Sequence, residues 1–417
     1  MLRVIELFSG IGAQAKALER IGKNYKIVKT CDWDANAIVA YWLIHNPQIN
    51  LEKYDKISDE AIDAFLSSKT LSMDGKKIIS PVTYKRLSSD FKRLLYIAIR
   101  DTHNMVSITD VKSSDIPDSI DVMTYSFPCQ DLSACGYWHG NKSGISRDAH
   151  NRSGMLWEVE RVLKEMNSEN RQLPRFLVME NVTNILSSTH EKDFNDWLDT
   201  LNKLGYYNRI FRLSAGQFGV PQKRERAYMV SVFYGDNDCM LEKIKAYFDN
   251  NNLEKENVAN RYIDRRFNLK NVLKLDYSKQ KYKTEADACQ PNDTPSRQKI
   301  WEENDILFDG KHINEMLVNT VTTKQDRNPN SGLIVYKNGV KGKSKWRYLT
   351  PRECFMLMGF DETDYDKMIS REIECWKGKK LFTLEKQYRM AGNSICVNVI
   401  EAIFKQIDEL KRLMKKW

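Results

Sequence analysis

One cysteine, Cys129, stands where a nucleophile is useful. Residues 121–124 form an apolar run that predicts a buried strand of a parallel sheet. Pro128 cannot continue a strand, so the chain leaves the sheet there and places the thiol at the sheet's edge. In open α/β sheets, chemistry takes place beyond the carboxyl ends of the strands, and a thiol there is a candidate nucleophile. Taken alone, Cys129 is better explained as a small buried apolar side chain, so its surroundings decide.

Two further strand ends carry ionisable side chains. Glu180 follows the apolar run 176–179 in the same predicted sheet, where it could protonate or hydrogen-bond a bound base. The basic turn 222–226 leads into another apolar strand. Taken alone, Glu180 would be better interpreted as a solvated loop carboxylate, and the basic turn as a run of surface charges. The side chains that alternation places on one face of the turn are Gln222, Arg224 and Arg226.

The N-terminus has the form of a nucleotide-binding unit. An apolar strand over residues 3–8 runs into two glycines, Gly10 and Gly12, and then into a helical stripe over 13–21. Glycines allow close backbone approach, and a helix N-terminus offers free N–H groups. The GxGxxG fingerprint is not met, which argues against a nucleotide-dependent oxidoreductase. A tight structural turn would use the same glycines.

Acidic residues at the ends of the next strands fit the same ligand. A strand over 26–30 leads to Asp32, roughly 20 residues after the glycine turn, where an adenosine ribose would be held. Trp33 beside it could cover a purine ring or belong to the core. A short third strand over 106–110 is expected to end in Asp110, placed to accept from an adenine amino group. At this single position a solvated loop aspartate is the stronger interpretation.

The composition is that of a globular protein with a basic surface. The chain has 417 residues, of which 41% are hydrophobic and 29% charged, and a net charge of +9. A polyanionic partner is therefore plausible but not proven. No run approaches a membrane span and no leader pattern precedes the first strand, so we expect a cytoplasmic protein. The eight cysteines form no CxxC pair or Cys/His cluster, which predicts neither a metal site nor a disulfide framework.

Taken together, the motifs resemble those of the cytosine carbon-5 DNA methyltransferases, the bacterial or phage enzymes of restriction-modification type. They occur in the family's order across nearly the whole chain, and this ordered set is far more specific than any one of its members. The first motif departs from many members because Ala13 stands where they have another glycine. The segments are 8–12 (FSGIG, cofactor), 128–130 (PCQ, catalysis), 180–182 (ENV) and 222–226 (QKRER) for the target base, 347–354 (RYLTPREC, ninth motif) and 392–395 (GNSI, tenth motif).

The resemblance implies an α/β fold, a Rossmann-like, doubly wound and mostly parallel sheet of the S-adenosylmethionine-dependent methyltransferase type. Residues 1–231 would be the first part of the catalytic and cofactor-binding large domain. Residues 232–346 would form a smaller, irregular target-recognition domain. Residues 347–417 would hold a hinge motif and a C-terminal helix that returns to the large domain. A stripe of apolar residues between 395 and 410 predicts that this helix packs there.

The resemblance also implies a mechanism and a set of site residues. Cys129 would add to carbon 6 of cytosine, Glu180 would contact ring nitrogen 3, and Arg226, supported by Arg224, would orient the base. The base must flip out of duplex DNA, at a cost of roughly a few kcal/mol. The cofactor would be S-adenosyl-L-methionine, with S-adenosyl-L-homocysteine as product. Its contacts would be Phe8, Gly10, Ile11, Gly12, Asp32, Trp33, Asp110, Val111, Pro128, Leu156, Asn393 and Ser394. DNA contacts would be Gln130, Ser133, Thr320, Gln325 and Arg327.

Two segments depart from compact relatives. The loop 133–154 is longer than usual and is predicted to close over the flipped base. The excursion 46–104 is predicted to be helical and to lie on the surface, without chemistry of its own.

Alternatives remain open at this stage. A related family methylates a transfer RNA, although the long insertion before the ninth motif favours duplex DNA. A DNA-binding repressor with an inactive site is disfavoured by the intact Cys129, Glu180 and Arg226. We expect a monomer acting on double-stranded DNA. A separately acting restriction endonuclease, an orphan role and a phage origin are equally compatible. The target sequence cannot be deduced from side-chain identity.

Overall fold

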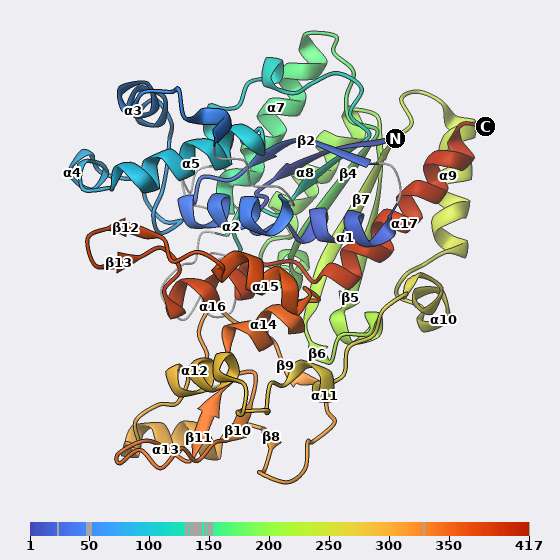
Figure 1. Cartoon of the computed structure of the whole chain (residues 1–417). Helices are drawn as coiled ribbons and strands as arrows, with labels where there is room; N and C mark the ends of the chain where they lie inside the picture. The colour runs from blue at the N-terminus through green and yellow to red at the C-terminus, as the bar shows by residue number, and fades with distance from the viewer. Residues whose placement is uncertain are drawn as a thin grey trace.

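The computed structural model describes residues 1–22, 25–46, 52–129, 132, 144–145, 147, 153–327 and 330–416. Its centre is a six-stranded sheet in the order β2-β1-β3-β4-β7-β5 (Figure 1). The pairs β1–β2, β1–β3 and β3–β4 are parallel, and β7 is antiparallel to both of its neighbours. The sheet is therefore mostly parallel, as predicted. Its strands are β1 (Leu2–Leu7), β2 (Tyr25–Cys31), β3 (Val122–Tyr125), β4 (Phe176–Val182), β5 (Tyr206–Ser214) and β7 (Glu225–Phe233).

Both faces of this sheet are covered by helices. Side chains of one strand alternate between the faces, so Val4 belongs to one core cluster and Ile5 to the other. The first face packs against α1 (Ala13–Ile21) and α17 (Val397–Met414), and the second against α7 (Leu156–Ser168) and α8 (Glu191–Lys203). The predicted stripe on the C-terminal helix is buried there, with Ile403 and Ile407 at most 1% exposed.

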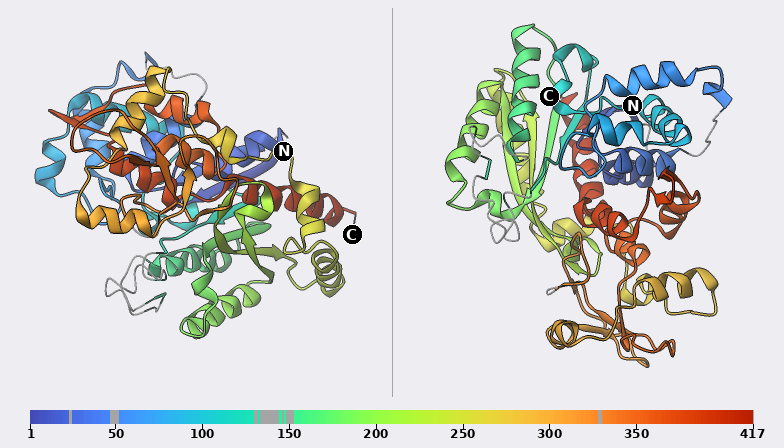
Figure 2. Two further views of the ribbon diagram at one scale, coloured as in Figure 1. Left: turned by 90° about the horizontal axis from the view of Figure 1, so that it is seen from below. Right: turned by 90° about the vertical axis from the view of Figure 1, so that its left-hand side faces the viewer.

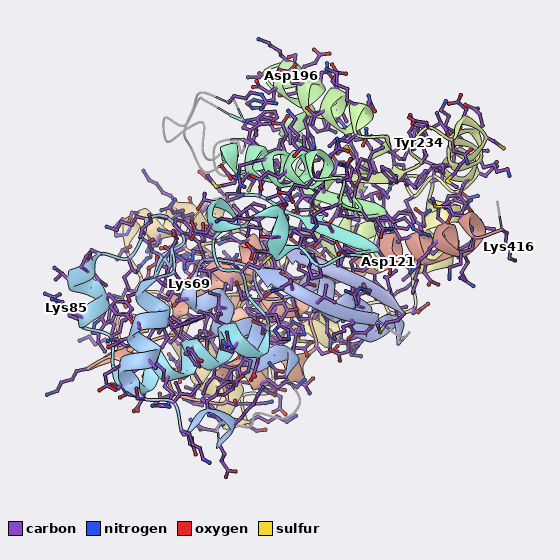
Figure 3. All side chains as sticks on the ribbon, turned by 90° about the horizontal axis from the view of Figure 1, so that it is seen from above. Lys69, Lys85, Asp121, Asp196, Tyr234 and Lys416 are labelled. Carbon is purple, nitrogen blue, oxygen red and sulfur yellow. The ribbon has the colours of Figure 1, made fainter. Side chains whose placement is uncertain are left out.

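The excursion after α2 (Ala35–His45) is helical, as predicted, but it has a core of its own. Each of its three longer helices begins at a serine whose hydroxyl accepts an N–H bond from the first turn. Its core also takes in Cys375 and Leu381, from the hairpin of β12 (Glu374–Trp376) and β13 (Lys379–Lys380). In the view of Figure 3, Lys69 and Lys85 mark this region, far from Tyr234 and Lys416. Its elements are η1 (Glu52–Tyr54), α3 (Asp59–Ser67), α4 (Pro81–Lys85) and α5 (Ser89–Asp101).

A smaller unit projects from one end of the molecule (Figures 1 and 2). It contains a three-stranded sheet of β11 (Trp346–Tyr348), β10 (Leu333–Val335) and β8 (Ile306–Phe308), with α12 (Gln280–Ala288) and α13 (Pro295–Glu302). It joins the larger part through the pairing of β6 (Gln222–Lys223) with β9 (Val318–Asn319).

The division of the chain at residues 231 and 232 stays a prediction. The next helix, α9 (Asp238–Asn250), places Ile244 and Phe248 in the core cluster of the large sheet. Leu269 and Val272 lie in the same cluster. Leu307 and Ile334 of the smaller unit belong to this cluster too, so the two parts share one continuous core.

The expected strand over 106–110 is not formed. Asp110 N–H bonds to the Ser107 carbonyl and Val111 N–H to the Ile108 carbonyl, so this backbone closes on itself as a 3-10 turn. No helix in the described part of the chain is both long and apolar enough to span a bilayer. The remaining elements are η2 (Ile108–Asp110), η3 (Ser113–Asp115), η5 (Ser153–Met155), η6 (Thr183–Leu186), η7 (Ala215–Phe218), α10 (Glu256–Ala259), η8 (Asn260–Tyr262), α11 (Leu269–Val272), α14 (Pro351–Leu357), α15 (Glu362–Ile369) and α16 (Leu384–Asn393).

Candidate active site

A cavity of about 440 Å³ lies beyond the carboxyl ends of β1, β2, β3 and β4. The chain order reverses at β1, which has β2 on one side and β3 on the other. Such a switch point is where open α/β sheets bind their ligands. Twelve of the predicted site residues line this cavity: Phe8, Gly10, Ile11, Asp32, Trp33, Pro128, Cys129, Glu180, Arg224, Arg226, Asn393 and Ser394.

Cys129, Glu180 and Arg226 lie together at one end of the cavity. The Arg226 Nε is 3.5 Å from Oε1 of Glu180, and both side chains are mostly buried. Burial, and then the neighbouring Glu180 carboxylate, raise the pKa of the Cys129 thiol, while Arg226 and Arg224 lower it. Burial also raises the pKa of Glu180 against the same two arginines. Burial thus favours the neutral forms of both the carboxyl and the thiol, and the two arginines favour their ionised forms.

The loop that carries Cys129 is fixed by the strand next to it. Asn181 Nδ2 donates to the Phe127 carbonyl at 3.1 Å, and Asn184 Nδ2 donates to the Leu132 carbonyl at 2.7 Å. Leu132 N–H in turn bonds to the Cys129 carbonyl at 3.0 Å. Asn181 sits beside Glu180 in the sequence, but nothing in the pattern indicated its bond across to the neighbouring strand.

Arg224 lies beside this group but has a different set of contacts. Its guanidinium is buried and donates to the carbonyls of Val321 (3.1 Å), Gly392 (3.1 Å) and Ser394 (2.8 Å). Burial lowers its pKa to about 10. Gln222 makes a second link, accepting from Val321 N–H at 2.8 Å. These two side chains tie the strand entering β7 to the segment before residue 323 and to the C-terminal motif.

The other end of the cavity is built around Asp32. Its carboxylate accepts from Gly10 N–H and from Asp34 N–H, each at 2.9 Å. Burial and the nearby Asp34 raise the pKa of Asp32 to about 6. Gly10 has a φ of 52° and no heavy atom within 4 Å of where a Cβ would lie, so the wall there is open. Trp33 adds a half-buried aromatic ring to the same wall.

Gly12 is required for packing and does not line the cavity. Its φ is 80°, and a Cβ there would lie 2.8 Å from the Tyr41 ring and closer still to His45. Phe8 and Val106 line the cavity with φ values of 56° and 67°, which non-glycine residues rarely adopt. Such strain, of order 1–3 kcal/mol each, gathers at functional sites.

Besides Gly12, three predicted cofactor residues lie outside the cavity wall. Asp110 is exposed and borders a separate shallow depression. Val111 and Leu156, the first residue of α7, are buried in the core cluster on the second face of the sheet. Their neighbours Thr109 and Met155 reach the wall instead. The roles assigned to these three residues stay predictions.

The predicted DNA contacts are only partly described. Arg327 is exposed and Thr320 half-buried, with the Thr320 hydroxyl donating to the Lys223 carbonyl at 2.6 Å. Gln325 is 1% exposed, and both polar atoms of its amide bond to Ser331 at 3.2 Å. Its placement does not support direct contact with a base. Gln130 and Ser133, like most of the loop 133–154, lie outside the described residues.

Comparisons with known proteins agree with this geometry. A family model described as C-5 cytosine-specific DNA methylase matches residues 2–73 and 84–409. The chain is 34% identical over 409 residues to the orphan methyltransferase M.SssI of Spiroplasma monobiae, covering 97% of each chain. It is 29% identical over 409 residues to the type II methyltransferase M2.ScrFI of Lactococcus lactis subsp. cremoris, covering 98% of this chain and 99% of that one.

Solved structures show the same fold at low identity. The S. pombe Dnmt2 methyltransferase superposes with a TM-score of 0.56 at 18% identity, covering 98% of this chain and 99% of the other. The Entamoeba histolytica methyltransferase EhMeth gives a TM-score of 0.54 at 16% identity with the same coverage.

The chain belongs to the C-5 cytosine-specific DNA methylase family. Its activity is that of a DNA (cytosine-5-)-methyltransferase, and the family and fold imply use of S-adenosylmethionine. The family and the named relatives favour DNA over the transfer RNA alternative.

Proposed function

We propose that this enzyme methylates a cytosine flipped out of a short site in double-stranded DNA, with Cys129 as the nucleophile. The observation that carries the proposal is the shared cavity. Cys129, Glu180 and Arg226 stand at one end, and Gly10, Asp32 and Trp33 at the other. A base and a methyl donor bound in one cavity can react without crossing solvent.

The catalytic end of the cavity holds the groups that can make carbon 5 of cytosine nucleophilic. This carbon is a poor nucleophile until a thiolate adds to carbon 6 and converts the ring into an enamine. Glu180, whose pKa is raised, would donate a hydrogen bond or a proton to ring nitrogen 3 as negative charge develops there. Arg226 would favour the Cys129 thiolate electrostatically and orient the base. After methylation, loss of the carbon 5 proton and cleavage of the sulfur–carbon 6 bond restore the thiolate.

The cofactor end fits an adenosyl group. The Gly10 backbone leaves open space, Asp32 offers carboxylate oxygens for ribose hydroxyls, and Trp33 offers an aromatic face. Asn393 and Ser394 close the wall from the C-terminal motif. When bound, S-adenosyl-L-methionine supplies an electrophilic methyl group and leaves as S-adenosyl-L-homocysteine.

Several finer points belong to the same proposal. The enzyme would act as a monomer in the cytoplasm, where its DNA substrate lies, and a cognate restriction endonuclease, if there is one, would act separately. Arg327 and Thr320 are the described candidates for DNA contact, and Arg224 would support the base site by holding the segments around it.

Bisulfite sequencing of a plasmid from cells that express this protein tests the proposal, with Cys129→Ala as the control. Protected cytosines at one short motif, in the active protein only, are expected. Absence of any protected site would contradict a DNA substrate, and transfer RNA would be the next substrate to test.

A further inference from the structure

A turn of the excursion lies in the wall of the active-site cavity, although no chemical role was predicted for this segment. We call residues 70–79 the insertion turn. Thr70, Gly75, Lys76, Lys77 and Ile78 line the same cavity as Asp32 and Trp33. Ile78 is 62% exposed, so its apolar side chain is accessible to a group bound in the cavity.

Backbone hydrogen bonds dock the insertion turn on the end of β2. Ser72 N–H bonds to the Trp33 carbonyl at 2.8 Å, and Ala35 N–H bonds to the Ser72 carbonyl at 2.9 Å. Asn36 Nδ2 donates to the Met73 carbonyl at 2.9 Å. The turn is therefore fixed to Trp33, a predicted cofactor contact, and to the first two residues of α2.

The insertion turn is also held together from within. The Asp74 carboxylate accepts from Lys76 N–H at 2.9 Å and from Lys77 N–H at 3.1 Å, and these bonds lower its pKa. The Ser72 hydroxyl, which is buried, donates to the Lys77 carbonyl at 2.6 Å. A turn with this many internal bonds keeps its shape without a ligand.

Arg389 clamps this turn to the cofactor end of the site. It lies on α16 and lines the cavity just before the C-terminal motif. Its Nη2 is 2.6 Å from Oδ2 of Asp34, and its Nη1 donates to the Asp74 carbonyl. Asp34 in turn holds the Asp32 carboxylate through its backbone N–H. One guanidinium thus connects the C-terminal segment, the insertion turn and the acidic loop.

We propose that the insertion turn is a wall of the cofactor site and that Arg389 is its positioning residue. The ligand would be the adenosyl group of the methyl donor or its product. Ile78 would cover part of the apolar surface of that group, while Arg389 would hold both the turn and the Asp32 loop. This inference rests on the proposed function, since it assigns new residues to the same cofactor.

The first test compares two arginine variants by calorimetric titration with S-adenosyl-L-homocysteine. Arg389→Met should raise the Kd about tenfold, as expected for loss of one charge-assisted contact that shapes the site. Arg389→Lys should restore part of the affinity. Arg93→Met is the matched control, because Arg93 also cross-links the excursion, to Asp59 and to the Tyr54 and Ile57 carbonyls, but does not line the cavity.

The melting temperature and the Kd for DNA without cofactor separate positioning from loss of structure. Both should change alike in the Met variants at 389 and 93, whereas only the variant at 389 should lose affinity for S-adenosyl-L-homocysteine. Equal affinity for S-adenosyl-L-homocysteine in Arg389→Met and Arg93→Met would contradict the positioning role of Arg389.

The second test addresses the wall itself. Ile78→Ser should raise the Kd for S-adenosyl-L-homocysteine about threefold, because it removes apolar contact. Val82→Ser is the control, since Val82 is 63% exposed and does not line the cavity. An unchanged Kd in Ile78→Ser would contradict the proposal that the insertion turn is a wall of the cofactor site. If the unmodified enzyme failed to bind S-adenosyl-L-homocysteine at all, the proposed function itself would be contradicted.

Discussion

The two ends of the active-site cavity each contain a buried carboxyl group, but the two groups are surrounded differently. Glu180 faces the arginines 224 and 226, whose charges only partly offset the effect of burial on its pKa. Asp32 instead receives two backbone N–H bonds, and Asp34 adds to the rise in its pKa. Burial raises the pKa of both carboxyls, and the neighbouring charges then act in opposite directions: the arginines favour the ionised form of Glu180, and the Asp34 carboxylate favours the protonated form of Asp32. The two carboxyls therefore differ in their partners, which are arginine side chains for Glu180 and backbone N–H groups for Asp32.

The largest expected effect is the loss of methyl transfer from a substitution at the catalytic end alone. Cys129→Ala should reduce methyl transfer to background, because no other described side chain in the cavity wall is a comparably placed nucleophile. Binding of S-adenosyl-L-homocysteine should persist, since Asp32 and Trp33 are untouched. Incorporation of labelled methyl groups measures methyl transfer, and calorimetric titration measures cofactor binding. A parallel loss of cofactor binding would show that the two ends of the cavity are not independent.

Glu180→Gln tests the part that the carboxyl at the catalytic end plays in methyl transfer. We expect kcat to fall about 10²–10⁴-fold, because an amide can hydrogen-bond ring nitrogen 3 but cannot protonate it. The measurement is single-turnover methylation of a duplex that carries the target site. A kcat within a few-fold of the parent would assign Glu180 to binding only.

Arg224 and Arg226 should separate into a structural and an electrostatic residue. Arg224→Met leaves three buried carbonyls without their donor and should lower the free energy of unfolding by about 3 kcal/mol, measured by urea denaturation. Arg226→Met should mainly raise the pKa of the Cys129 thiol, so that its alkylation by iodoacetamide moves to higher pH. If Arg224→Met and Arg226→Met changed the free energy of unfolding and the pH dependence of alkylation equally, the two arginines would not have separate roles.

The smallest effect is a pH dependence at the cofactor end. Burial raises the pKa of Asp32 to about 6, above its usual value of 3.8, so the carboxylate gains a proton as the pH falls through about 6. Cofactor affinity should therefore be constant above that pH and fall up to about tenfold per unit below it. Calorimetric titrations with S-adenosyl-L-homocysteine between about pH 5 and 8 check this, because folded proteins are generally most stable in that range. Asp32→Asn should remove the pH dependence of cofactor affinity.

The same comparison shows what could be predicted from the sequence. The sheet and the placement of Cys129, Glu180 and Arg226 in one cavity follow from local patterns, because each residue comes directly after or within a strand. The strand expected at 106–110 is a 3-10 turn, and Gln325 is buried where a DNA contact was expected. Short polar segments carry little information about which side chains face solvent.

The insertion turn and Arg389 could not be predicted in this way. Arg389 and Asp34 are 355 positions apart, and no periodicity or motif in either segment indicates the other. A contact of this kind depends on how the excursion and α16 pack, which is decided by the tertiary fold.

The packing of α17 has a consequence for the synthesis of this enzyme. This helix of 18 residues fills part of the core cluster of the central sheet, packs on α1 and contacts Met1 through Lys411. The part of the sheet that it covers therefore stays exposed until α17 has been synthesised. A product truncated before residue 394 would lack both this helix and Ser394 of the cavity wall. We expect such fragments to be degraded before they can modify DNA.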